Sequence, residues 1–269
     1  MTKFPAFHSH SIPGGTRNSL LLLLGSYTWV SHRQHQRNPD DTTIPSWSQI
    51  GKGVAQIVGI NKRSGERWLV VDAKATGTRY FLGLALGVAS AVIIGMAMGC
   101  FAPVEAFLQP PLSFLAQIPP TAALAVFFVL VGTGQEMYVA MIAFGILPAL
   151  AQTVYLAVKE FPEELLYKTY TLGASHMEVI CSIILSQVLP RLLDALRLVI
   201  GPALVYLIAA EMVVGDVGFG YRIRLQSKLL NMSVVYPYLA LLAAFGFTMN
   251  YLLCRLQCKL CPWYDPGRE

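Results

Sequence analysis

Long apolar segments dominate the chain from residue 80 onward. Four of them contain no Asp, Glu, Lys or Arg: residues 80–100, 106–135, 137–158 and 232–253. A fifth segment, residues 192–215, is apolar apart from Asp194, Arg197 and Glu211. Crossing the hydrocarbon core of a bilayer takes about 20 residues in a helix, whereas barrel strands would alternate apolar with polar residues. The pattern therefore predicts an all-α membrane protein with at least five spanning helices.

The part of the chain before residue 80 is more polar. Residues 18–31 are apolar but short for a span and follow basic residues, so the apolar region of a signal peptide is the alternative to a short first span. No small-x-small cleavage site follows, which favours a sixth span. Residues 47–60 are predicted to form an amphipathic helix on the membrane surface. The chain is divided into four parts: a disordered N-terminus (1–17), a short first span with a polar connection (18–79), a transmembrane domain (80–257) and a tail (258–269).

The apolar segment 80–100 carries small residues at every fourth position. These residues are Gly83, Gly87, Ala91, Gly95 and Gly99. A step of four residues turns a helix by roughly 400°, so they form one slowly drifting ridge. Small side chains at this spacing let two helices approach closely in lipid. The ridge therefore predicts a tight helix–helix contact, and a glycine-lined permeation path is the alternative.

The composition supports a membrane protein and excludes several other classes. Of 269 residues, 55% are hydrophobic and 13% are charged, against roughly 25% charged residues in a soluble domain. The net charge of +5 is consistent with bases in loops that face lipid headgroups, and no basic aromatic patch indicates nucleic-acid binding. Cys254, Cys258 and Cys261 are interpreted as free thiols, since a metal site would want a fourth ligand. No nucleophile–base constellation and no phosphate-binding loop is present, so an enzyme is not expected.

The connection at residues 162–190 shows two helix signals separated by a break. Pro162 suits a helix start, and two glutamates follow it. Gly173 is placed to end this helix in a left-handed conformation. Ser175 and Glu178 then have the spacing of a capping box, which predicts a second helix leading toward Pro190. An ordinary polar loop between two spans would not explain two helices that each have clear start or end signals.

This loop resembles the cytoplasmic coupling loop of ABC-type importer permeases of the binding-protein-dependent class. Gly173 within Leu172-Gly173-Ala174-Ser175 matches the glycine of the family motif, and Leu185 and Leu189-Pro190 match its end. The sequence departs from the motif in two places: Tyr167-Lys168-Thr169 stands where the family has Glu-Ala-Ala, and Ser186 replaces a proline. Residues 117–134 and 209–221 resemble two further family segments. The sequence is most similar to the nitrate, sulfonate, taurine and bicarbonate subfamily.

The resemblance implies a polytopic bundle of five to six transmembrane helices in the bacterial inner membrane, with a cytoplasmic coupling loop and a cytoplasmic tail. It implies alternating access driven by cytoplasmic ABC ATPase subunits, together with a second permease copy and a periplasmic solute-binding protein. ATP and magnesium would be used by the ATPase, and no cofactor is expected in this chain. An ion-gradient-driven secondary transporter is the alternative, but the sequence shows no internal repeat.

Two charged residues in the segment 192–215 are candidates for the translocation path or a gate. An unpaired charge at the centre of a membrane helix costs about 2.5–3.5 kcal/mol, so such residues are functional candidates. Glu211 is expected to act in gating, or else to pair with a base such as Arg222. Arg197 is a candidate for an anion path, and the alternatives are that it pairs with Asp194 or reaches the lipid headgroups by snorkelling.

Overall fold

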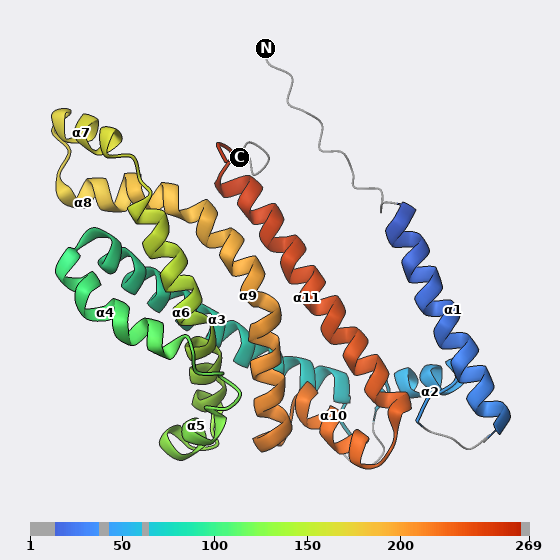
Figure 1. Ribbon diagram of the computed structural model, residues 1–269. Coiled ribbons are helices and arrows are strands. Elements are labelled where there is room, and N and C mark those ends of the chain that lie inside the picture. The colour runs from blue at the N-terminus through green and yellow to red at the C-terminus, as the bar shows by residue number, and fades with distance from the viewer. Residues whose placement is uncertain (1–13, 38–42, 61–64, 265–269) are drawn as a thin grey trace.

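The computed structural model describes residues 14–37, 43–60 and 65–264, and these residues are almost entirely helical (Figure 1). In chain order the helices are α1 (Gly14–Arg37), α2 (Trp47–Val58), α3 (Trp68–Cys100), α4 (Ala102–Leu115), α5 (Leu124–Val131), α6 (Gln135–Lys159), α7 (Glu163–Thr171), α8 (His176–Glu178), the π-helix η1 (Val179–Ile184), α9 (Leu185–Val214), α10 (Phe219–Lys228) and α11 (Met232–Leu260).

Among the described residues, four helices are long and apolar enough to cross a bilayer. They are Trp68–Cys100, Gln135–Lys159, His176–Val214 and Met232–Leu260. The predicted all-α membrane fold is thereby confirmed. The segment 18–31 lies inside α1, which is not among the four, so its crossing of the membrane stays a prediction. The predicted amphipathic helix is α2, which begins with a capping box between Ser46 and Gln49.

The prediction of one continuous span over residues 106–135 is wrong. The segment divides into α4, a non-helical stretch at residues 116–123, and α5. The break coincides with Pro119 and Pro120, which lack the N–H that a helix needs and disfavour helical geometry in the residue before them. The α5 helix then ends at Gly132, whose φ is +89°. The two short helices together occupy the place of the predicted span.

The start of the first long helix also differs from the prediction. Helix α3 begins at Trp68, well before residue 80, and so includes part of the predicted polar connection. Polar residues can continue a helix when partners satisfy them. Asp72, Thr76 and Arg79 are all buried and all bonded to other elements, as described below.

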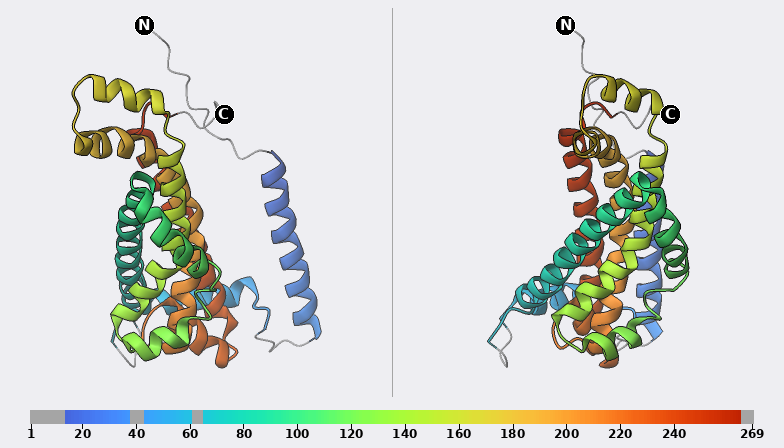
Figure 2. Two further views of the ribbon diagram at one scale, coloured as in Figure 1. Left: turned by 60° about the vertical axis from the view of Figure 1, so that its left-hand side comes forward. Right: turned by 90° about the vertical axis from the view of Figure 1, so that its left-hand side faces the viewer.

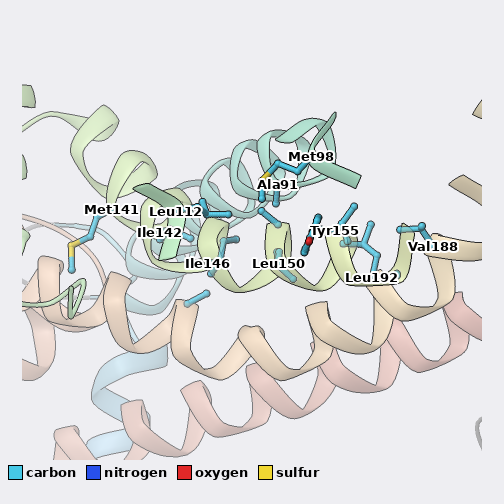
Figure 3. Packing of buried hydrophobic residues seen from close by; sticks show 14 of the residues in the cluster. Ala91, Met98, Leu112, Met141, Ile142, Ile146, Leu150, Tyr155, Val188 and Leu192 are labelled. Carbon is cyan, nitrogen blue, oxygen red and sulfur yellow. The ribbon is translucent and has the colours of Figure 1, made fainter. Parts of the chain in front are cut away.

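The ridge of small residues lies against α6, as its spacing predicts. A Cβ atom at Gly83 would lie 2.7 Å from Ile142 Cβ, and one at Gly99 would lie 2.5 Å from Val158 Cβ. Because both residue numbers rise together, α3 and α6 run side by side in the same direction. Ala91 sits in the same contact with no exposed surface (Figure 3). The ridge is therefore a packing surface and not a permeation path.

Substituting Gly95 with alanine is expected to destabilise this contact. The added Cβ would lie 2.6 Å from Val154 Cβ and 2.7 Å from the Ala151 carbonyl oxygen, so the backbones would have to separate. Overpacking of this kind costs about 1–3 kcal/mol. The matched control is Gly77→Ala in the same helix, where nothing lies within 4 Å. Thermal unfolding of the two variants in detergent should show a lowered midpoint for Gly95→Ala alone; equal midpoints would contradict the packing role.

The short helices gather at the two ends of the bundle. Helices α7 and α8 project at one end, which we call the coupling end, and α2 and α10 lie at the opposite end, which we call the far end (Figures 1 and 2). Helices α8, η1 and α9 form one continuous helix, His176–Val214, that runs from the coupling end to the far end. This helix passes through Pro190, so the predicted second helix of the loop and the following span are a single element.

Candidate functional site

The first helix of the coupling end finishes in a Schellman motif. Helix α7 ends at Thr171, and Gly173 then has a φ of +85°. The Gly173 N–H donates to the Tyr170 carbonyl (3.0 Å) and the Ala174 N–H donates to the Thr169 carbonyl (3.2 Å). These two bonds satisfy carbonyls at the end of the helix and reverse the chain. Gly173 thus adopts the left-handed conformation that the sequence predicts, and it lies at the reversal of the loop.

The second helix starts with the predicted capping box. Ser175 Oγ accepts a hydrogen bond from the Glu178 N–H (3.4 Å), and Glu178 Oε2 accepts one from the Ser175 N–H (2.8 Å). The Tyr170 hydroxyl also contacts His176 Nδ1 at 2.6 Å, which joins the two helices across Gly173. The reversal is thus fixed by hydrogen bonds on both sides of Gly173.

Large apolar side chains are exposed around this reversal. Leu172 is 86% exposed, Met177 is 71% exposed and Tyr167 is 67% exposed. We call these three residues, with Gly173, the coupling tip. Exposed apolar groups gathered at one place mark a surface for a protein partner or a membrane, and the tip projects beyond the spanning part of the bundle. The remaining motif residues Leu185, Leu189 and Pro190 lie in the long helix, where they are half-buried or buried.

A buried ion pair joins α3 to α9 at the far end. Glu211 has no exposed surface, and its Oε1 accepts hydrogen bonds from Arg79 Nη1 (2.9 Å) and Thr76 Oγ1 (2.9 Å). Its Oε2 accepts a bond from the Gly220 N–H (2.9 Å). The prediction that Glu211 pairs with Arg222 is wrong, and its partner is Arg79. Helix α3 begins early enough to bring the Arg79 side chain to the end of α9.

Arg222 belongs to a second buried pair beside the first. Its Nε donates to Asp72 Oδ2 at 2.9 Å, and the same carboxylate accepts bonds from the Tyr238 hydroxyl (2.8 Å) and the Gly218 N–H (3.1 Å). Burial on its own lowers the pKa of Arg222, but the hydrogen bond and charge of Asp72 outweigh it and raise the pKa. The guanidinium also lies over the Trp68 ring, at 4.4 Å from its centroid.

The two pairs together hold the loop at residues 215–220, and we call them the far-end cluster. Gly218 in this loop has a φ of +121°, and a Cβ there would lie 2.5 Å from Glu211 Oε1, so a glycine is required. The sequence did not single out three residues of this cluster, Asp72, Thr76 and Arg79, as functional candidates. Their spacing of four and three residues places them on one helix face, a signal that could have identified them.

Arg197 lies elsewhere on the long helix. Its Nη1 is 3.6 Å from Asp194 Oδ1, which confirms the predicted pairing, and its Nε donates to Asn250 Oδ1 on α11 at 3.0 Å. Asp194 also accepts hydrogen bonds from Gln257 (2.9 Å) and Tyr264 (3.0 Å). The arginine thus takes part in a polar contact between α9 and α11, and its role in an anion path stays a prediction.

Comparison with known families identifies the class of this fold. Residues 83–260 match the family described as "Binding-protein-dependent transport system inner membrane component". The chain belongs to this family. It is therefore a multi-pass inner-membrane permease of an ABC transport system, and the alternative of an ion-gradient-driven secondary transporter is not supported.

Individual relatives place the chain further within the family. It is 29% identical over 190 residues to the taurine transport system permease protein TauC of Escherichia coli (strain K12), covering 71% of this chain and 69% of that protein. It is 25% identical over 185 residues to the putative aliphatic sulfonates transport permease protein SsuC of Bacillus subtilis (strain 168), covering 69% and 67%. The fold matches an inward-facing structure of the MetNI methionine ABC transporter with a TM-score of 0.63 and 20% identity, covering 72% of this chain and 96% of that one.

Proposed function

We propose that this permease imports a small anionic solute together with a pair of cytoplasmic ATPase subunits, a second copy of the chain and a periplasmic solute-binding protein. The observation that carries the proposal is the coupling tip. A capped helical reversal that exposes Leu172 and Met177 beyond the spanning bundle suits insertion into a groove on a partner protein. In this arrangement the coupling end is cytoplasmic and the far end is periplasmic.

The long helix gives the tip a direct mechanical connection to the far end. His176–Val214 is continuous over 39 residues, which is about 58 Å at 1.5 Å per residue. Its first residue follows the capping serine of the tip, and Glu211 lies in its last turn. Movement of the ATPase subunits on binding and hydrolysing ATP with magnesium would therefore be passed along this helix and would tilt α9. The permease chain contributes the helix that transmits the movement, and ATP hydrolysis takes place in the separate ATPase.

The far-end cluster is the proposed gate of the translocation path, and the long helix is the element that moves it. Arg79 and Asp72 hold the loop at residues 215–220 through Glu211 and the Gly218 N–H, so the loop follows α3 and α9 together. Tilting α9 relative to α3 would strain these bonds and move the loop. Glu211 thus acts in gating through the position of the loop, and it does not bind an anion, because its carboxylate is negative and fully bonded.

The proposed solute class is that of small sulfonates and related anions such as nitrate. Its support is the similarity to permeases named for taurine, aliphatic sulfonates and nitrate. In a binding-protein-dependent system, the binding protein that delivers the solute accounts for most of the selectivity. The permease then needs a path that accepts an anion and releases it.

Co-purification tests the proposed docking. A tagged chain extracted from its native membrane in mild detergent is expected to carry an ABC ATPase in comparable amount. Leu172→Asp should lose the ATPase, because a charged side chain replaces an exposed apolar contact. The control is Leu229→Asp at the C-terminal end of α10, which changes a 67% exposed leucine at the far end, away from the tip and outside the spanning helices. Retention of the ATPase by Leu172→Asp, or its loss from both variants, would count against the coupling tip.

A further inference from the structure

A cavity of about 420 Å³ lies among α4, the non-helical stretch at residues 116–123, α6 and α9. Its polar lining comes from the side chains of Ser113, Gln117, Gln152 and Tyr206. No charged residue lines it in the described part of the chain. The coupling tip and the far-end cluster do not contribute to it, so it is a separate feature of the bundle.

The cavity lies midway between the two ends of the bundle. Helix α4 starts directly after α3 ends, at the coupling end, and α5 finishes shortly before α6 starts, at the far end. The stretch between α4 and α5 is therefore at middle depth. Contacts agree with this placement: a Cβ at Gly145, near the middle of α6, would lie 3.2 Å from Pro120 Cγ and 2.5 Å from the Tyr206 ring.

Non-helical backbone at this depth needs shielding from the lipid hydrocarbon. In a membrane protein, irregular backbone inside the hydrocarbon region is tolerated only where protein covers it or where it lines a water-filled cavity. Pro119 and Pro120 carry no N–H, so two helical hydrogen bonds in succession would be missing there. Residues 116–118 and Pro120 line the cavity, so the broken segment borders an internal space. Transport proteins form solute sites from such discontinuous helices near the bilayer midplane.

The polar side chains of the cavity are available to a solute. Among the described residues, none of Ser113, Gln117, Gln152 and Tyr206 makes a side-chain hydrogen bond to the rest of the chain. Hydroxyl and amide groups donate hydrogen bonds to the oxygens of an anion and carry no charge of their own. A transport site must bind well enough to admit the solute and weakly enough to release it, which neutral donors achieve better than a fixed cation.

We infer that this cavity is a transient mid-membrane site for the oxoanion group of the solute, with Gln117, Gln152 and Tyr206 as donors. The inference rests on the proposed import of a small anion and adds the place where this permease holds it. Ser113, near the end of α4, also lines the cavity. Since the cavity is bordered by both α6 and α9, movement of the long helix changes its shape during the transport cycle.

A charge series at Gln152 tests the inference in the full complex, reconstituted in liposomes with radiolabelled taurine as the probe. Gln152→Leu removes a donor to a charged group and is expected to lower the rate of uptake about tenfold. Gln152→Glu should lower it further by repulsion. Gln152→Lys should retain labelled taurine on the solubilised complex after gel filtration, which the wild type and Gln152→Glu should not. All three variants should accumulate in the membrane and assemble with the ATPase as the wild type does, which the elution of the solubilised complex in gel filtration reports.

The same three substitutions at Gln56 are the control, because that glutamine is exposed on α2. Unchanged uptake in the Gln152 variants, or an equal loss in all three without retention by Gln152→Lys, would overturn the inference. Uptake by the wild type tests the proposed function, while retention by Gln152→Lys tests the cavity without need of transport. Failure of the proposed import and failure of the proposed cavity site can therefore be distinguished.

Discussion

Replacing Gly173 with aspartate is expected to abolish solute uptake while the protein stays in the membrane at its normal level. Gly173 adopts a φ of +85°, a conformation that costs an ordinary L-residue about 1–2 kcal/mol. A Cβ there would meet nothing within 4 Å, so the substitution causes no clash within the chain. The loss would instead come from a negative charge on the coupling tip and from a weakened reversal between α7 and α8.

Two further variants separate these causes. Gly65→Asp is the matched control, because Gly65 also has a positive φ of +70° and open space around it but lies before α3, at the far end. It should keep normal uptake. Gly173→Asn carries no charge and tolerates a left-handed backbone, so it should retain part of the activity. Normal uptake by Gly173→Asp, measured beside its membrane level by immunoblot, would contradict the coupling role.

Removing the Glu211 carboxylate is expected to have the largest effect on stability. Glu211→Ala would leave Arg79 buried without its partner and would also remove the acceptor of Thr76 and of the Gly220 N–H. Breaking a buried ion pair from one side costs about 3–5 kcal/mol, because an uncompensated charge stays behind. Thermal unfolding of the purified variant should show a clear fall in the midpoint, or the protein should fail to accumulate.

A carboxylate beside the same arginine supplies the control. Asp216 lies 3.8 Å from Arg79 Nη2, but its side chain is 88% exposed, so Asp216→Ala should change the unfolding free energy by less than about 1 kcal/mol. The double variant Glu211→Met with Arg79→Met should regain much of the stability, since neither charge remains buried. If that double variant is stable and still transports at the wild-type rate, Glu211 has a structural role and no role in gating.

The coupling loop could be predicted from the sequence because its signals are local. Ser175 and Glu178 are three residues apart, and Gly173 acts through its own backbone conformation. Local chemistry of this kind is independent of how distant segments pack. The ridge of small residues was predicted for a similar reason, since its period depends only on helix geometry. Its partner helix, α6, was not predicted.

The far-end cluster and the broken segment could not be predicted in the same way. Arg79 and Glu211 are 132 residues apart, and only the packing of α3 beside α9 brings them together. Apolar composition alone does not distinguish one long span from two short helices. The break at Pro119 and Pro120 was therefore not predicted. Both errors have one physical origin: tertiary contacts satisfy polar side chains and broken backbone that would be costly in an isolated segment.

ATP-dependent uptake in sealed liposomes tests the central claim most directly. The permease would be reconstituted with its ATPase, with ATP at the ATPase side and a taurine-loaded binding protein at the other. The account predicts uptake that requires both ATP and the binding protein and that continues when ionophores collapse all ion gradients. Uptake that proceeds without ATP and stops when an ion gradient is collapsed would contradict it.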